Sequence, residues 1–136
     1  MTIGGAAYDC AEQYMMHQKA LLFGDDETAA QILAATDPAR QKALGRTIKG
    51  FDEKVWRDHR ETIVHTGSHA KFDQNKGLRR KLFQTGDALL VEASPLDAIW
   101  GVGLSADEAK ATPPEEWPGL NLLGKILTKV REELRL

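Results

Sequence analysis

Two charged residues near the start of the chain, Glu12 and Lys19, have the types and the spacing to do chemistry. If residues 11–23 form a helix, the seven-residue spacing nearly completes two turns and places both side chains within roughly 20° of each other. The residues that flank them on that helix are apolar, namely Met15, Leu22, Met16 and Phe23. Because a charge is seldom placed on an apolar surface unless it is paired or functional, this pair is a candidate site.

The chemistry that such a pair allows is acid–base or nucleophilic. A carboxylate near a desolvated lysine suits general acid–base catalysis, and the lysine can also attack C1 of a sugar and form a Schiff base. The alternative is that each charge meets an opposite charge elsewhere in the fold or extends to water. A direct pair is not favoured, because the two residues are about 10.5 Å apart along the helix axis. Gln13 and His17 are expected on another face of the helix.

A tryptophan between small residues forms a second candidate site. Trp100 is followed by Gly101 and Gly103 and preceded by Asp97. Glycines let a backbone turn sharply or approach a ligand, and a tryptophan ring can stack on a base. The alternative is a tight turn around a core tryptophan. A phosphate loop is not predicted, because the third glycine and the Gly-Lys-Ser/Thr ending are absent.

Two further groups of residues are weaker candidates. His65 and His69 have a helical spacing that can bind a metal, but the glutamate of a His-Glu-x-x-His motif is absent, so an exposed polar end is favoured. A basic cluster can bind phosphate, although such runs usually form a solvated face. That cluster comprises Lys76, Arg79, Arg80 and Lys81. We expect neither a metal nor a redox cofactor.

The elements that position these residues follow from caps and periodicity. Residues 3–8 are typical of a strand end or hairpin, and apolar residues repeat at helical spacing from Asn121 onward. Apolar runs at 88–93 and 99–104 predict two strands. The other predicted helices are residues 11–23 between an Asp9 N-cap and Gly24, one after Asp25-Asp26, one from Asp37-Pro38, one from Asp52 to about 68, and residues 76–84 after Asn75. We therefore expect an α+β fold, with residues 1–136 forming a single helix-rich domain with a small β-sheet.

Length and composition place the chain among ordinary globular proteins. With 136 residues, 42% hydrophobic and 28% charged, it has the size of one domain and the balance of a folded chain. The net charge of −2 argues against a strong non-specific grip on nucleic acid but allows a local basic pocket for a phosphorylated small molecule. No apolar run approaches the roughly 20 residues that span a bilayer, and no secretory signal is visible, so no membrane association is expected. The single cysteine, Cys10, fits a reducing compartment, and we expect a cytoplasmic protein.

Motif-like segments follow one another along nearly the whole chain. They are Ala11-Glu12-Gln13-Tyr14 with Gln18-Lys19-Ala20, Trp56 with Arg60, Ala70-Lys71-Phe72-Asp73-Gln74, residues 82–85, residues 90–95 with Asp97, Trp100-Gly101 and Gly103, and residues 119–124 leading into Val130-Arg131. In type and order these segments resemble the motifs of the YbiA/NADAR family. The block from 90 to 103 is the most specific match, and the common order makes coincidence a poor explanation.

The resemblance implies a helix-rich α+β fold that binds phosphorylated ribose ligands and hydrolyses N-glycosidic bonds. It implies two substrate classes: phosphorylated ribosylamino-pyrimidine intermediates of riboflavin synthesis, and ADP-ribose attached to guanine, which can lie in nucleic acid. By this resemblance Glu12 and Lys19 would be catalytic. The substrate-binding residues would be Trp100, Asp97, Gly101, Gly103, Asn121, Trp56, Arg60 and Lys71.

Two departures from the family pattern bear on activity. Family members begin with a further segment, which contains a Ser-Asn-Phe-like motif that helps build the pocket, whereas this sequence starts just before the expected catalytic helix. Val102 stands where some relatives have an acid, a difference that can change which substrate is accepted. The alternative function is therefore a binding module that holds ADP-ribose or a nucleotide without cleaving it. A structural or interaction domain is a third interpretation.

Overall fold

The chain begins with a small antiparallel hairpin of strands β1 (Thr2–Ile3) and β2 (Ala6–Ala7), as the sequence predicted. Gly4 and Gly5 turn the chain with φ values of 58° and 84°, a conformation that costs little only for glycine. The N-terminal ammonium closes the hairpin by donating to the Tyr8 carbonyl at 2.9 Å. This hairpin is the whole β-sheet of the protein.

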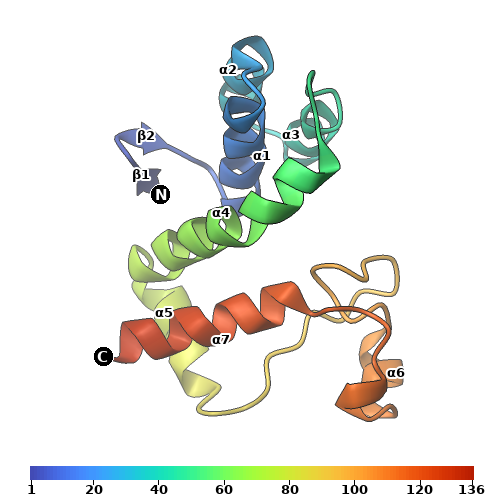
Figure 1. Ribbon diagram of the computed structural model, residues 1–136. Helices are drawn as coiled ribbons and strands as arrows, with labels where there is room; N and C mark the ends of the chain where they lie inside the picture. Colours follow the sequence, from blue (N-terminus) through green and yellow to red (C-terminus); the bar gives the residue numbers. More distant parts are fainter. The chain divides into compact units, whose positions relative to one another are not determined.

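The computed structural model describes residues 1–136 and divides them into two compact units, Met1–Leu78 and Arg79–Leu136, which are described separately here. The helices, drawn in Figure 1, are α1 (Ala11–Leu22), α2 (Asp26–Ala34), α3 (Pro38–Gly45), α4 (Glu53–Asp73), α5 (Lys76–Gln84), α6 (Ala106–Lys110) and α7 (Leu122–Arg135), with a 3₁₀ helix η1 (Pro114–Glu116). None of these helices combines the length and the apolar composition needed to span a bilayer.

In the N-terminal unit, α1 is the helix against which α2, α3 and α4 pack (Figure 1). The apolar core lies where these helices meet, and its buried members are Met16, Ala20, Ala29, Ile32, Leu44 and Ile48. Burial of apolar side chains stabilises by about 25 cal/mol per Å², so this cluster is the main source of the unit's stability.

Three of the predicted helix starts are confirmed by their caps. The carboxylates of Asp25, Asp37 and Asp52 accept from backbone N–H groups at the N-termini of α2, α3 and α4. Each carboxylate satisfies donors that have no partner inside the helix. The fourth helix is longer than predicted and continues to Asp73, since no residue after Ser68 interrupts it.

The predicted cap of α1 is wrong by one residue. Cys10, rather than Asp9, is the N-cap, and its Sγ accepts from the Gln13 backbone N–H at 3.4 Å. The Asp9 backbone N–H instead donates to Gln13 Oε1 at 2.6 Å. The side-chain amide of Gln13 therefore completes this helix start, while Asp9 stays exposed.

Gln13 is itself buried, with 1% of its surface exposed, and its amide ties α1 to the end of α2. Its Nε2 lies within hydrogen-bond distance of the carbonyls of Ile32, Leu33 and Ala35, at 3.1–3.4 Å. These carbonyls belong to the end of α2 and its C-cap, where intrahelical donors run out. A buried polar side chain here replaces water as their partner.

The C-terminal unit has no strands, so the strands predicted at 88–93 and 99–104 are wrong. Leu89 and Val91 are 62% and 38% exposed, and no neighbouring strand pairs with their segment. The carbonyls of Ile99 and Trp100 instead accept from the backbone N–H groups of Leu122 and Leu123, at 3.1 Å each. These two donors open α7, so residues 99–100 cap a helix rather than joining a sheet.

The unit also contains a short helix that the apolar pattern did not predict. Ser105 and Glu108 form a reciprocal capping box at the start of α6. The Trp117 indole N–H lies 3.2 Å from the Ala109 carbonyl and 3.1 Å from the Thr112 carbonyl, at the end of that helix. The Ser-x-x-Glu spacing was the available sequence signal.

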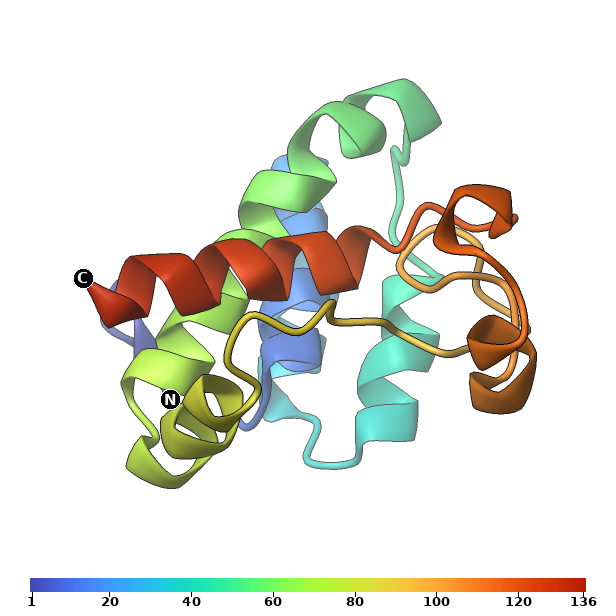
Figure 2. The same ribbon diagram turned by 90° about the horizontal axis from the view of Figure 1, so that it is seen from below.

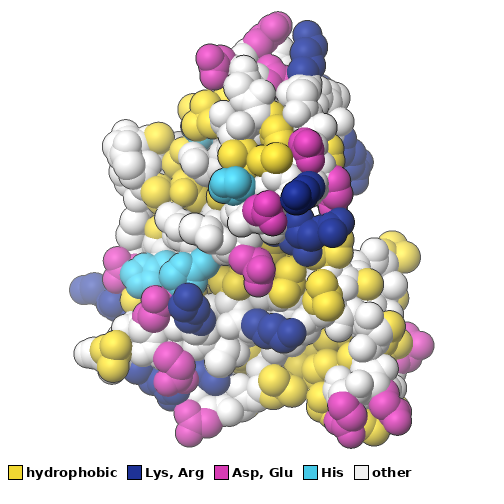
Figure 3. All heavy atoms as spheres, viewed as in Figure 1, with side chains coloured by type: hydrophobic (Ala, Val, Ile, Leu, Met, Phe, Trp, Pro, Cys, Tyr) yellow, Lys and Arg dark blue, Asp and Glu magenta, His cyan; other side chains and the backbone are white.

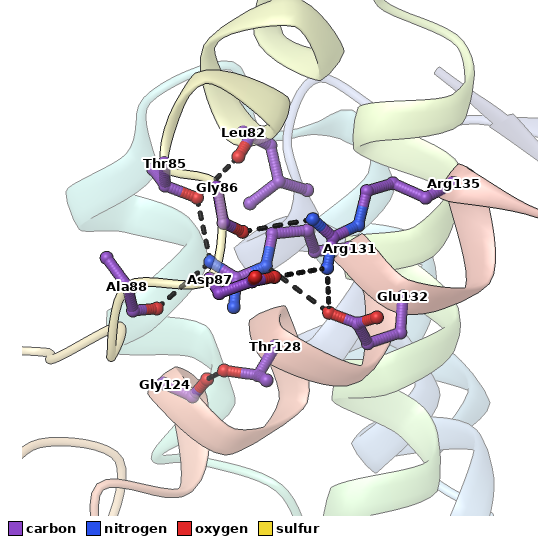
Figure 4. A network of polar contacts seen from close by, with 10 residues as sticks. All are labelled: Leu82, Thr85, Gly86, Asp87, Ala88, Gly124, Thr128, Arg131, Glu132 and Arg135. Carbon is purple, nitrogen blue, oxygen red and sulfur yellow. Dashed lines mark hydrogen bonds and ion pairs between the residues drawn. The ribbon is translucent and has the colours of Figure 1, made fainter.

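Two arginines of α7 fix the chain that leaves α5 (Figure 4). The guanidinium of Arg131, 3% exposed, donates to Thr85 Oγ1 at 2.8 Å and to the Ala88 carbonyl at 3.0 Å. Arg135 donates to the Gly86 carbonyl at 3.1 Å and pairs with Asp87 at 3.1 Å. The network holds residues 85–88 at the C-terminal part of α7.

A buried tyrosine–histidine pair joins the hairpin to α1, and it predicts a pH-dependent stability. Tyr8 Oη lies 2.9 Å from His17 Nδ1, and burial lowers the pKa of His17 below its usual value. The native state favours the neutral His17 ring. Its contribution to the free energy of unfolding is therefore complete above the unfolded pKa of about 6.5 and is lost as the pH falls. We expect the free energy of unfolding, measured by urea titration, to fall from roughly pH 7 to pH 5 less steeply in His17→Gln than in the unmodified protein.

The matched control is His59→Gln, because His59 is exposed on α4. The loss of slope in His17→Gln should exceed that in this control. Equal slopes in the unmodified protein and His17→Gln would show that His17 does not carry the effect.

Candidate functional site

The ammonium of Lys19 is enclosed by aromatic rings and a carbonyl. Its Nζ lies 4.8 Å from the centroid of the Phe51 ring and 5.4 Å from that of Trp56. It donates to the Gly45 carbonyl at 3.3 Å. This arrangement, the aromatic box of Lys19, consists of Phe51, Trp56 and the Gly45 carbonyl.

No carboxylate forms an ion pair with Lys19, so the interpretation that it is neutralised by an opposite charge is wrong. Burial lowers the pKa of the Lys19 ammonium, and the more distant Glu53 carboxylate opposes that change. Desolvation disfavours the charged form, whereas cation–π attraction favours it. Desolvation outweighs the effect of the Glu53 charge, so the neutral, nucleophilic form of Lys19 is easier to reach than that of an ordinary surface lysine.

Glu12 precedes Lys19 by seven residues, or nearly two turns, on α1 and is exposed. Its carboxylate makes no ion pair and no hydrogen bond in the structure. A carboxylate without partners is available to accept a proton or to face positive charge on a ligand. The pair predicted from the sequence is therefore present on one helix, with one member half-buried and the other open to solvent.

The apolar arc predicted around this pair is only part of the buried surface of α1. The most buried residues of the helix also include Gln13 and His17, which the periodicity placed on another face. Both are buried because their polar atoms have fixed partners, the last carbonyls of α2 and the Tyr8 hydroxyl. The pair thus lies toward the margin of the core rather than at its centre.

Phe51 and Gly45 were missed by the sequence reasoning, although Phe51 had a signal. Phe51 precedes the Asp52 N-cap, and Trp56 occupies the fourth position of α4. Apolar residues at these two positions are the sequence pattern of a hydrophobic staple, which fixes how the chain enters a helix. These two positions at the start of α4 supply both rings that lie near the Lys19 ammonium.

The other predicted residues of the N-terminal unit lie along α4. Trp56 and Arg60 are both buried, at 8% exposure, whereas Lys71 is exposed with its Nζ 5.6 Å from the Phe72 ring centroid. The structure brings Trp56, but not Lys71, to Lys19. His65 and His69 have rings 6.2 Å apart, and no group of three potential metal ligands occurs in the structure.

In the C-terminal unit, Asp97 shapes the loop that carries Trp100. Asp97 Oδ1 accepts from the backbone N–H groups of Ile99 and Trp100, at 2.9 Å each. A Cβ on Gly101 would lie 2.7 Å from the Asp97 carbonyl and 2.9 Å from the Glu92 carbonyl, so only glycine fits there. Gly103, with φ 74°, closes the loop by donating to the Asp97 carbonyl at 3.2 Å.

Asn121 holds the extended segment of residues 90–92 beside the start of α7. Figure 2 shows the course of this segment next to α7. Its Oδ1 accepts from the Glu92 N–H at 2.9 Å, and its Nδ2 donates to the Leu90 carbonyl at 3.0 Å. The side-chain amide thus pairs with the segment as a neighbouring strand would. The residue is 5% exposed and has a left-handed backbone, φ 53° and ψ 42°, which asparagine tolerates better than most residues.

Two open cavities lie along the same extended segment. One has a volume of about 420 Å³ and the other of about 490 Å³, and Leu89, Pro114 and Trp117 line both. Of the predicted site residues, Asn121 lines the larger cavity. On the face seen in Figure 3, acidic and basic side chains are interspersed and do not form one large patch of a single charge.

The amide bridge of Asn121 predicts a large effect of a small substitution. Asn121→Asp keeps the size and the acceptor but removes the donor to the Leu90 carbonyl, leaving two oxygens face to face. We expect a loss of about 1–3 kcal/mol in the free energy of unfolding, measured by urea titration with circular dichroism. Asn75→Asp is the matched control, since Asn75 uses only its Oδ1, to accept from Leu78 N–H at 3.0 Å, and an aspartate caps equally well. A cost for Asn121→Asp no larger than that control would show that the donor does not matter.

Comparison with known proteins identifies the family of the chain. The model of the NADAR domain matches residues 1–135. An N-glycosidase of Acanthamoeba polyphaga mimivirus is 48% identical over 128 residues, which cover 94% of this chain and 75% of that protein. A riboflavin biosynthesis protein of Vibrio vulnificus (strain YJ016) is 33% identical over 135 residues, or 99% of this chain and 33% of that protein. The NMR structure of the Escherichia coli protein YbiA matches with a TM-score of 0.79 and 28% identity, over 98% of this chain and 71% of that one. With a family model that matches almost every residue, the chain belongs to the NADAR family.

Proposed function

We propose that the protein is an N-glycosidase that hydrolyses the bond between a phosphorylated ribose and a base. The observation that carries this proposal is the half-buried Lys19, whose ammonium is desolvated without an ion pair. A lysine in this state is suited to attack a carbon that carries developing positive charge. The names of the viral and bacterial relatives, N-glycosidase and riboflavin biosynthesis protein, support the same reaction type.

In the proposed reaction the bond between C1 of the ribose and the base nitrogen breaks first. The base leaves with the bonding electrons and takes up a proton, and positive charge develops on C1 and the ring oxygen. Glu12, an exposed carboxylate on the same helix as Lys19, stabilises this charge.

The neutral amine of Lys19 then adds to C1, and the proton that the amine loses passes through water to the departed base. Opening of the ribose ring gives a Schiff base, and water hydrolyses it to release the sugar phosphate and restore the amine. Reduction with borohydride followed by mass spectrometry would trap the Schiff base on Lys19. Direct attack of water, activated by Glu12, would leave Lys19 unlabelled in that experiment.

The proposed substrates are of two classes, phosphorylated ribosylamino-pyrimidines and ADP-ribose attached to guanine. The Vibrio relative is named for riboflavin biosynthesis, which favours the first class. For phosphate binding we propose the cations of α4, Arg60 and Lys71. For Trp56 we propose a role in positioning Lys19, because its ring faces that ammonium.

In the C-terminal unit we propose that Trp100 offers a ring face to the base. Asp97 then acts by fixing the backbone of the loop, since its Oδ1 accepts from Trp100 N–H. Gly101 and Gly103 allow the loop to close, and Asn121 supports the extended segment that leads to it. Measurement of binding to Trp100→Ala and Trp100→Phe by calorimetry would separate ring stacking from loop structure.

The catalytic assignment predicts that Glu12→Gln lowers kcat by about 10²–10⁴ while the protein folds normally. The measurement is base release from both substrate classes by liquid chromatography and mass spectrometry. Glu27→Gln is the matched control, because Glu27 is exposed on the neighbouring helix α2. Full turnover by Glu12→Gln would refute the assignment, and binding of ADP-ribose without base release by the unmodified protein would identify a binding module instead.

A further inference from the structure

The connection between α3 and α4 presents Phe51 to Lys19 through a series of fixed contacts. Thr47 Oγ1 donates to the Leu44 carbonyl at 2.8 Å, and the Lys49 N–H donates to Asp25 Oδ2 at 2.9 Å. The pKa of Asp25 is lowered first by the hydrogen bond from Lys49 N–H, so its carboxylate stays ionised as an anchor. Asp52 then begins α4, one residue after Phe51.

The Phe51 ring is supported from the side of α1 and remains partly open to solvent. Its centroid lies 5.3 Å from that of Phe23, in an edge-to-face arrangement with an interplanar angle of 63°. The residue is 43% exposed, although it is a large aromatic side chain. A ring that is held in place on one side and open on the other can cover the lysine without forming part of the core.

The two rings of the aromatic box differ in what they contribute. Trp56 is buried and belongs to the core of the unit, whereas Phe51 is the exposed cover of Lys19. The Gly45 carbonyl fixes the direction of the amine from the end of α3. Of the charged groups on the helices that pack on α1, Glu53 of α4 acts on Lys19, and the neighbouring Arg46 and Lys49 are exposed.

From these contacts we propose that Phe51 is a positioning residue for Lys19, whose ring excludes water from the amine and holds it in the direction needed for attack on C1. The role in attack rests on the proposed function, whereas the effect on the amine itself does not. Truncation of the ring admits water, and a hydrated amine favours its charged form more strongly and samples several rotamers. A ring of the same shape should preserve both properties.

The test is trace acetylation of the full chain with acetic anhydride over a pH series, with mass spectrometry of every lysine. Acetylation requires the neutral amine, so the midpoint of labelling reports the pKa of each lysine in one sample. In the unmodified protein we expect the labelling midpoint of Lys19 to lie below the ordinary lysine value. In Phe51→Ala that midpoint should move upward, toward the ordinary value.

Two conservative variants separate water exclusion from attraction to the ring face. Phe51→Tyr keeps both and should behave as the unmodified protein. Phe51→Leu keeps an apolar cover but removes the cation–π attraction that favours the charged form, so the midpoint should move downward. Leu33→Ala, which truncates a partly exposed apolar residue on α2, should leave the midpoint unchanged.

Kinetics with the base-release assay then tests the link to catalysis. Phe51→Ala should lose kcat by on the order of tenfold, and the acidic limb of its pH–rate profile should move with the labelling midpoint. An unchanged Lys19 midpoint in Phe51→Ala would overturn the proposal. If that variant did not fold, equal midpoints in Phe51→Tyr and Phe51→Leu would do the same. Full turnover by Lys19→Met would refute the catalytic role of the lysine while leaving the labelling result valid.

Discussion

The packing of α1 against three other helices is the constraint on which the N-terminal unit depends. Met16 and Ala20 of this helix enter the apolar core, so its position relative to α2, α3 and α4 is fixed. Buried polar residues on the same helix have hydrogen-bond partners; the Gln13 side chain, for example, donates to a carbonyl at the end of α2. Lys19 therefore lies on a rigid element, and rigid elements hold reactive groups more accurately than loops do.

The C-terminal unit contains extended segments but no sheet, so the backbone groups of these segments need other hydrogen-bond partners. The backbone of residues 90–92 bonds to the amide of Asn121, and the carbonyls of Ile99 and Trp100 bond to the first N–H groups of α7. The start of one helix thus organises both segments. Such an arrangement satisfies buried backbone groups without strand pairing, as the cost of leaving them unsatisfied requires.

Local chemistry explains which parts of the fold could be predicted from the sequence. Aspartates before apolar runs marked α2, α3 and α4, since a carboxylate there has only one obvious partner. The apolar runs at 88–93 and 99–104 led to a wrong prediction of strands, because such runs resemble buried strands. The segment at residue 90 bonds instead to the side-chain amide of Asn121, which is distant in the sequence. Glu12 and Lys19 were found as a candidate site from their spacing, whereas Phe51 was not, since its place beside Lys19 depends on the turn between α3 and α4.

Phe51 lies directly before the N-cap of α4 and is proposed to cover Lys19. It therefore links opening of the start of α4 to exposure of the Lys19 amine to water. Helix termini open and close more often than helix centres, and the hydrophobic staple limits that opening. If Phe51 covers Lys19 as proposed above, opening of the first turn of α4 would move the ring away from Lys19 and expose the amine to water. The fraction of time for which the amine is protected is therefore set by the local unfolding equilibrium of one helical turn. Temperature or denaturant at levels that leave the fold intact should change the reactivity of this lysine before it changes any global property.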